Sequence, residues 1–280
     1  MKRGNRRKKI FIFVIILVLI ALFSFFYFNY NKEKITADVV TKSDIKTVDL
    51  TNPDPDTREE VKIPIIMYHH IRSYDREDDP IGTNLSISEE IFTEHLDHLK
   101  TNGYTTITFD SLNKFPNSAL PQKPIILTFD DGYDDNYQAY KLLKKNGMVG
   151  TFYIISNYID RAGHLTLEQI TKMSESGMEI GSHTMNHLDL ANISEEKLVS
   201  ELRESKVRLE EVTKKPVEDF CYPAGKYNQD VVKMVENAGY KTATTTKTGI
   251  ASTKDPRFEL KRLRVSHNDG LKSFINKLND

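Results

Sequence analysis

Residues 127–137 read LTFDDGYDDNY, an apolar, strand-like run that leads straight into Asp130, Asp131 and Gly132. Side chains alternate between the two faces of a strand, so both carboxylates could not enter one site if the strand continued. Gly132 permits a backbone turn that would end the strand there. Two like charges this close also push one carboxylate toward protonation unless a cation lies between them. The stretch therefore predicts a strand end with a cation site beside it.

One pattern recurs along the chain: a helical period, then a glycine, then an apolar run rich in β-forming residues. Each glycine suits the position just past a helix end, where a left-handed backbone is common. One helix is expected to open at Ser88, and another amphipathic helix is expected over residues 194–212. Alternating helices and short buried strands predict an α/β fold with a largely parallel sheet, and the number of units favours a barrel. The glycines of the pattern are Gly103, Gly147, Gly177 and Gly239.

Candidate functional residues lie just after the carboxyl ends of the predicted strands. In a parallel barrel the carboxyl ends of all strands share one face, and active sites are built on that face. Polar residues commonly end strands, but that tendency explains less easily a carboxylate pair and three histidines together. The residues at these positions are His69, Asp130 with Asp131, His183, Pro223 and His267.

The segment SHTMNH places His183 and His187 four residues apart, which on a helical turn brings both imidazoles to one face. One carboxylate and two imidazoles leave open positions for water and substrate, as in catalytic metal sites. Mixed nitrogen and oxygen ligands favour Zn²⁺, with Co²⁺, Ni²⁺ and Fe²⁺ as alternatives. An EF-hand is excluded, because Gly132 falls third rather than sixth in the acidic loop.

TFDDG and SHTMNH, in this order and spacing, resemble the first two motifs of the metal-dependent polysaccharide deacetylases, carbohydrate esterase family four. FCYPAGKYN resembles the third motif, and the resemblance spans about residues 61–270. It implies a distorted (β/α) barrel of about seven strands that hydrolyses N-acetyl groups of N-acetylglucosamine in a polymer and releases acetate. It also implies Asp130 as the general base, the backbone N–H of Ala224 as an oxyanion donor, and Asp131, His183 and His187 as metal ligands.

Some residues depart from that family pattern. Cys221 stands where the third motif usually carries an arginine that orients the base, and Arg262 or Arg264 could replace it. The chain has no tryptophan, so the family's fourth motif is missing and sugar stacking would fall to tyrosines. The candidates for contacting substrate near these loops are Tyr133, Tyr222, Tyr227, Arg264 and His267.

The opening of the domain, IPIIMYHH, resembles an exported branch of the family that acts on poly-N-acetylglucosamine or cell-wall glycan. In that branch the N-terminal histidine supplies the general acid, and His69 is the matching residue. Its neighbour His70 would point elsewhere if strand alternation persists. His267, in VSH, is the alternative acid, whereas His95 and His98 are interpreted as packing or surface residues of a helix.

The first 60 residues predict a membrane attachment. Residues 1–9 hold six basic residues, and residues 10–28 are 19 uncharged and mostly apolar positions, enough to span a bilayer as a helix. The basic flank should stay in the cytoplasm, which makes this a single-pass anchor with the remainder outside the cell. A cleaved signal peptide is the alternative. Residues 29–60 are polar and predict a flexible tether, and residues 61–280 are the predicted catalytic domain.

The remaining composition narrows the function classes. Without the six basic residues of the first segment, 33 basic residues face 40 acidic ones, a net charge of −7 that argues against a nucleic-acid partner. The single cysteine, Cys221, cannot form an internal disulfide. The expected partners are an N-acetylglucosamine-containing polysaccharide and the membrane, with no indication of an oligomer. An O-acetyl esterase acting on xylan or cell-wall glycan and an inactive glycan-binding module are the alternative functions.

Overall fold

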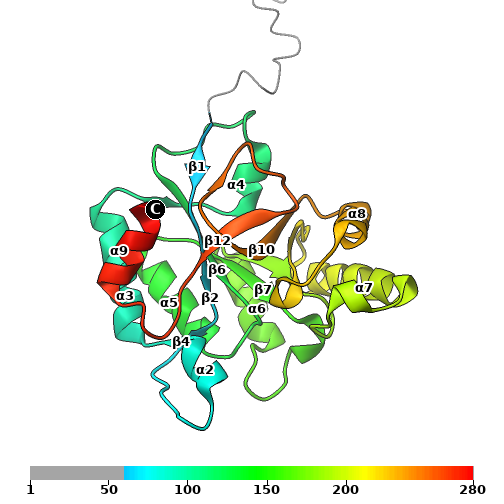
Figure 1. Cartoon of the computed structure of the whole chain (residues 1–280), viewed down its shortest axis with the longest axis horizontal. Helices are drawn as coiled ribbons and strands as arrows, with labels where there is room; N and C mark the ends of the chain where they lie inside the picture. The colour runs from blue at the N-terminus through cyan, green and yellow to red at the C-terminus, as the bar shows by residue number, and fades with distance from the viewer. Residues whose placement is uncertain (1–59, 280) are drawn as a thin grey trace, which may run out of the picture. The chain divides into compact units, whose positions relative to one another are not determined.

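The computed structural model describes residues 60–279 (Figure 1). The predicted basic segment 1–9, the membrane-spanning segment 10–28 and nearly all of the tether 29–60 lie outside these residues and stay predictions. Of the helices within residues 60–279, none combines the length and the apolar character that crossing a membrane requires.

Seven parallel strands close into a ring, because the first strand of the sheet order also pairs with the seventh. The order is β2, β12, β10, β9, β8, β7 and β6, and β6 pairs back with β2. The register between β10 and β12 shifts between Thr244 and Thr248, which makes the ring irregular. The prediction of a distorted parallel barrel is confirmed. The strands are β2 (Ile65–Tyr68), β6 (Pro124–Phe129), β7 (Thr151–Ile154), β8 (Glu179–Ser182), β9 (Asp219–Cys221), β10 (Thr242–Thr248) and β12 (Leu260–Arg264).

Shorter strands lie outside the ring. β5 (Thr105–Thr106) extends the sheet beyond β6. β1 (Lys62–Ile63) pairs antiparallel with β11 (Ala251–Ser252), and β3 (His70–Ile71) pairs in parallel with β4 (Ser86–Ile87).

Helices surround the ring, with α3 and α9 on one side and α7 and α8 on the opposite side (Figure 1). The N-cap of α3 is Ser88 and the N-cap of α7 is Ser194, which confirms both predicted helix starts. The glycines of the repeated pattern all have positive φ angles beyond helix ends, as predicted. The helices are α2 (Pro80–Asn84), α3 (Glu89–Thr101), α4 (Phe109–Lys114), α5 (Asn136–Asn146), α6 (Leu167–Glu175), α7 (Glu195–Thr213), α8 (Gln229–Asn237) and α9 (Leu271–Asn279), with short 3₁₀ turns η2 (Ser156–Tyr158), η3 (Leu190–Asn192) and η4 (Pro223–Gly225).

Strand alternation divides the core into two apolar layers. Ile125 and Leu127 of β6 belong to the large cluster that includes the buried faces of the helices, whereas Ile126 between them belongs to a smaller cluster. The smaller cluster also holds Ile65 of β2 and Leu260 of β12, and Ile65 pairs with Ile126 in the register. Every second residue from Ile126 onward therefore faces the barrel interior. At the carboxyl end of β6 the residues on this face, Thr128 and Asp130, are polar.

Candidate active site

The carboxylate pair lies at the carboxyl end of β6, where the strand stops at Phe129. Asp131 and Gly132 have φ angles of 74° and 70°, so two consecutive left-handed residues turn the chain sharply. A Cβ atom on Gly132 would also come within 3.0 Å of the Ile154 side chain. The sharp turn confirms the predicted strand end, and after it the two carboxylates contact different residues.

Asp131 meets both histidines of the SHTMNH segment. Its Oδ1 atom lies 3.4 Å from Nε2 of His183 and 3.4 Å from Nε2 of His187, and the three potential ligand atoms all lie within 4.8 Å of one another. Burial raises the pKa of Asp131, but the neighbouring histidines outweigh burial and hold that pKa well below its usual value. This carboxylate is therefore ionised, as a metal ligand must be.

The donor set of this group suits a divalent cation. His183 Nδ1 lies 2.8 Å from the carbonyl oxygen of Cys221, which can only accept, so Nδ1 carries a hydrogen and Nε2 is the atom that could bind an ion. Burial lowers the pKa of His183, but Cys221 and Asp131 outweigh burial and raise that pKa well above its usual value, so a bound cation would replace the proton on Nε2. Atoms that bind one Zn²⁺ tetrahedrally at about 2.0–2.1 Å are roughly 3.3 Å apart, close to the spacing found here. Asp131, His183 and His187 can thus hold a metal ion.

The local geometry of this segment differs from the predicted helical turn. Residues 183–187 form an irregular turn in which Thr184 and His187 have φ angles of 67° and 56°. The His187 N–H donates to Oγ1 of Thr184 at 2.9 Å, which closes the turn. The imidazoles converge because of these left-handed residues, so the predicted outcome is right but the helical reason for it is wrong.

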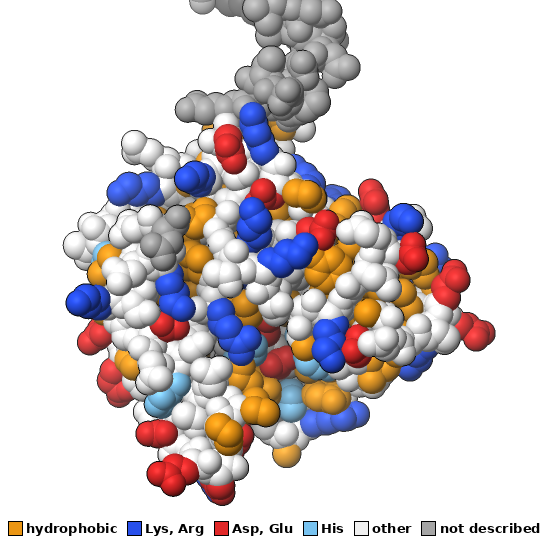
Figure 2. Space-filling model, in the orientation of Figure 1, with side chains coloured by type: hydrophobic (Ala, Val, Ile, Leu, Met, Phe, Trp, Pro, Cys, Tyr) orange, Lys and Arg blue, Asp and Glu red, His pale blue; other side chains and the backbone are white. Residues whose placement is uncertain are grey.

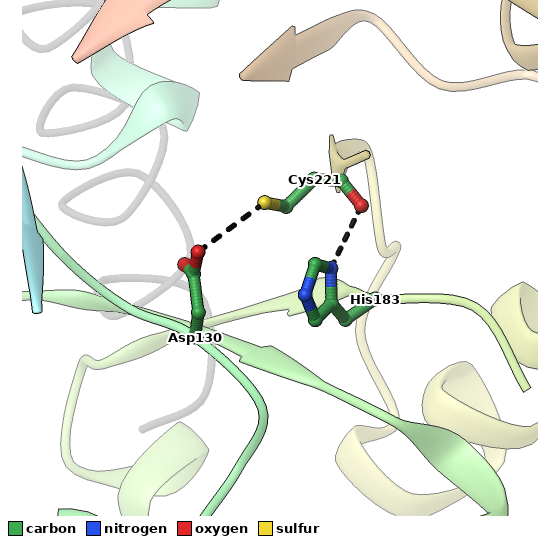
Figure 3. Close-up of side chains that lie close together, drawn as sticks. All are labelled: Asp130, His183 and Cys221. Carbon is green, nitrogen blue, oxygen red and sulfur yellow. Dashed lines mark hydrogen bonds between the residues drawn. The ribbon is translucent and has the colours of Figure 1, made fainter. Parts of the chain in front are cut away.

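Asp130 faces the barrel interior and is 3% exposed. The buried guanidinium of Arg262 grips it in a bidentate pair, with Nη1–Oδ1 at 2.7 Å and Nη2–Oδ2 at 2.8 Å. Burial raises the pKa of Asp130, but Arg262 outweighs burial and keeps that pKa below its usual value. The thiol of Cys221 lies beside the same carboxylate, with Sγ 3.6 Å from Oδ2 (Figure 3). Arg262 rather than Arg264 therefore takes the place of the arginine that position 221 lacks.

His69 follows β2 and turns its ring toward Asp130, with Nε2 4.0 Å from Oδ2. Burial lowers the pKa of His69 to about 4 against the opposing pull of Asp130, so the ring is neutral at neutral pH. Asn136 fixes the backbone beneath it, since its Nδ2 donates to the His69 carbonyl oxygen at 2.6 Å. His70 points elsewhere, as expected: its Nδ1 lies 2.6 Å from Oδ2 of Asp135.

The comparisons with known proteins agree with this geometry. A family model described as "Polysaccharide deacetylase" matches residues 117–243. The Bacillus subtilis protein YxkH, whose name places it among the polysaccharide deacetylases, is 37% identical over 213 residues, which cover 75% of this chain and 74% of that one. The chain belongs to the polysaccharide deacetylase family. Members of this family are hydrolases that act on amide bonds.

Two further relatives of this polysaccharide deacetylase carry more specific names. Streptococcus pyogenes deacetylase PplD, solved in complex with acetate, has 31% identity and a TM-score of 0.73, over 78% of this chain and 99% of that one. The peptidoglycan-N-acetylglucosamine deacetylase of Bacillus cereus is 37% identical over 146 residues, 51% of this chain and 62% of that one. The family match at 117–243 includes the carboxylate pair, His183 and His187, but it leaves out His69 and Arg262.

The second histidine considered as an acid in this polysaccharide deacetylase is placed differently. His267 is half-buried, and its backbone N–H donates to the Asn84 carbonyl oxygen at 3.3 Å. Within residues 60–279, no ionic contact joins His267 to Asp130 or Asp131, whereas His69 has such a contact. His95, interpreted as a packing residue, is fully buried and stacks on Phe274.

The predicted tyrosine platform needs a correction at Tyr222. This side chain is 1% exposed and its hydroxyl donates to the Phe258 carbonyl oxygen at 3.1 Å, so it packs in the core and cannot stack on a sugar. One face of Tyr133 is covered by the ring of His70, with 3.6 Å between the ring centroids. Tyr227 is half-buried and remains a candidate.

The remaining predicted residues lie at the rim or in turns. Ala224 is exposed in the turn η4 with a φ angle of 50°, and Arg264 is half-buried at the end of β12. Figure 2 shows histidine and acidic side chains gathered below the centre of the visible face, among apolar and basic neighbours. Sequence reasoning missed Asp135 and Asn136, which hydrogen-bond to the backbone of the segment after β2, although both belong to the polar run DDNY of residues 134–137.

Proposed function

We propose that this polysaccharide deacetylase hydrolyses N-acetyl groups of N-acetylglucosamine residues in an extracellular polysaccharide or peptidoglycan and releases acetate. The observation that carries the proposal is the division of the carboxylate pair. Asp131 joins two imidazole Nε2 atoms in a cation site, while Asp130, its chain neighbour, stays out of that site in the grip of Arg262. The names of relatives that act on peptidoglycan or bind acetate support the same reaction.

Asp131, His183 and His187 would hold a divalent metal, Zn²⁺ by the preference of these ligands, which would supply Lewis acidity toward water and the acetyl carbonyl. Asp130 is ionised and accepts the proton of the attacking water. Arg262 fixes the direction of both carboxylate oxygens, so the base is oriented without being a metal ligand. The backbone N–H of Ala224 is proposed to donate to the oxyanion from the exposed turn η4.

His69 is the proposed general acid. Expulsion of the sugar amine requires a proton, and a buried imidazole with a pKa of about 4 does not carry one before the reaction starts. Its Nε2 atom lies 4.0 Å from Oδ2 of Asp130, which is longer than a hydrogen bond, so a closer approach during the reaction would let the proton taken from water pass to His69 and then to the amine. This arrangement fits the branch of the family in which the N-terminal histidine supplies the acid.

The experiment is an acetate-release panel with β-1,4- and β-1,6-linked N-acetylglucosamine oligomers and intact peptidoglycan, each with and without a chelator. We expect release from at least one substrate and its loss with the chelator. Asp131→Ala should lose both metal and activity, whereas Asp130→Asn should keep the metal and lose activity, because an amide cannot accept the proton. An Asp130→Asn protein without metal would overturn this division of roles.

The proposed location is the outer surface of the cell membrane, with residues 10–28 as an uncleaved single-pass anchor. It rests on the basic flank and the length of the uncharged segment. Sequencing the N-terminus of the protein isolated from membranes tests it. A mature chain that starts near residue 30 would show cleavage and reject the anchor.

A further inference from the structure

A buried carboxylate that takes no part in the proposed chemistry lies behind the metal-ligand turn. Glu201, on α7, is 0% exposed. Its Oε2 accepts the backbone N–H groups of Met185 at 3.0 Å and Asn186 at 2.9 Å, and its Oε1 accepts Nδ2 of Asn186 at 2.6 Å. Lys197, one helical turn earlier, lies 3.2 Å from Oε1. Both carboxylate oxygens are thus directed at Met185 and Asn186, two of the three residues between His183 and His187.

The turn needs such a partner, because its backbone is strained. Thr184 and His187 are both left-handed, a conformation that costs a residue with a side chain roughly 1–2 kcal/mol. The turn also brings the N–H groups of residues 185 and 186 to one point, a concave donor pair that suits an anion. Glu201 supplies that anion from a long helix, so the strained shape is tied to a rigid element.

A second contact from α7 holds the start of the turn. The Ser205 hydroxyl, one helical turn beyond Glu201, lies 2.7 Å from the hydroxyl of Ser182. Ser182 in turn accepts the backbone N–H of Thr184 at 3.2 Å. The helix therefore grips the metal-ligand turn both at its start and at its middle.

We infer that Glu201 is a positioning residue for the metal site, which sets the turn of residues 183–187 so that both imidazoles meet Asp131 before any ion binds. The inference rests on the proposed function, since it assumes that this group binds a metal. A free turn would have to lose conformational freedom when the ion binds, and that cost would appear as weaker affinity. With Glu201 in place, the turn is already ordered in the folded protein, so metal binding does not carry this entropic cost.

The test compares the Zn²⁺ dissociation constant of the full chain with that of Glu201→Gln, by competition with a chelator. Gln keeps the shape of Glu but presents an amide N–H to one of the turn's donors. Loss of a group that orients metal ligands typically weakens affinity about 10–100-fold, and we expect a change in that range. Activity should return in excess Zn²⁺, because Asp130 and His69 are untouched. Glu204→Gln, the same change at an exposed position of α7, is the matched control and should bind Zn²⁺ as the wild type does.

A Glu201→Gln protein that binds Zn²⁺ as tightly as the Glu204→Gln control would overturn the inference and leave the proposed function standing. A wild-type chain that binds no Zn²⁺ would instead overturn the proposed function, and the inference with it. If Glu201→Gln does not fold, Asn186→Ala replaces it, since it removes one of the hydrogen bonds to Glu201 from the turn side. We expect roughly fivefold weaker binding from the loss of one such bond, and unchanged binding would refute the role of Glu201.

Discussion

Arg262→Met tests how much the buried ion pair of Arg262 and Asp130 stabilises the fold, because Arg262 is fully buried and its polar partners lie inside the barrel. Its guanidinium donates twice to Asp130, to the Thr245 carbonyl oxygen at 2.9 Å and to Thr128 Oγ1 at 3.0 Å, and it lies 3.2 Å from Cys221 Sγ. Methionine fills a similar volume without charge, so the substitution leaves Asp130 as a buried, unpaired carboxylate. Breaking a buried pair in this way typically costs about 3–5 kcal/mol.

The assay is urea unfolding of the metal-free protein at neutral pH, with Asp130→Asn/Arg262→Met as the companion variant. We expect the double variant to be more stable than Arg262→Met, because the asparagine removes the unpaired charge and leaves two neutral side chains. The single variant should lose most of the roughly 3–5 kcal/mol, a large fraction of a domain's usual stability. A loss below about 1 kcal/mol, or a double variant no more stable than Arg262→Met, would refute the importance of this ion pair.

The pH dependence of the same variant has a definite sign. In the wild type the pKa of Asp130 is below its usual value, so its contribution is present above about pH 4 and is lost as pH falls further. In Arg262→Met, burial acts without the opposing cation and raises that pKa, so the variant gains stability as pH falls from neutral toward about 4. The difference in unfolding free energy should therefore narrow on acidification. A constant difference from pH 7 to pH 4 would contradict this explanation.

Three further predictions concern single side chains. His69→Ala should keep its metal and lose on the order of 10²–10⁴ in rate, while His267→Ala should remain close to wild type; the reverse pattern in acetate release would exchange their roles. Tyr222→Phe should cost about 1 kcal/mol in unfolding free energy without changing KM, since its hydroxyl only holds the core; a raised KM would show that the hydroxyl contacts substrate. Burial and the nearby carboxylate of Glu179 raise the pKa of Asp219 well above its usual value, so the folded state binds the extra proton and the wild type should lose stability as pH rises above about 4. Asp219→Asn should flatten that dependence in unfolding curves measured across pH, and an unchanged slope would refute the assignment.

Local features of the site could be read from the sequence because each depends on a few consecutive residues. Asp130, Asp131 and Gly132 end a strand wherever the barrel places it, since two left-handed residues cannot continue one. The spacing of His183 and His187 likewise keeps two candidate ligands within one short turn. The repeated glycines marked helix ends for the same reason, as a backbone preference that holds whatever the tertiary context.

The partners of these residues could not be read in the same way, because they come from strands that are distant in sequence. Arg262 and Asp130 are 132 positions apart, on strands that both neighbour β2. Arg262 and Arg264 lie on the same side of β12, so strand alternation does not distinguish them. In the register Arg264 pairs with Met67, and Met67 pairs with Thr128 of β6. Only the path of the side chains inside the ring shows that Arg262 reaches Asp130.

The sequence by itself therefore determined the class of fold, the carboxylate pair and the two candidate ligand histidines, because periodicity and turn chemistry act over short stretches of chain. Tertiary structure decided which arginine orients Asp130, which histidine faces it and that Tyr222 is a core residue. It also decided that the ligand turn is left-handed rather than helical, with Glu201 behind it. These outcomes depend on the closure of the barrel and on which helix packs against each strand end, and both depend on contacts between segments far apart in the chain.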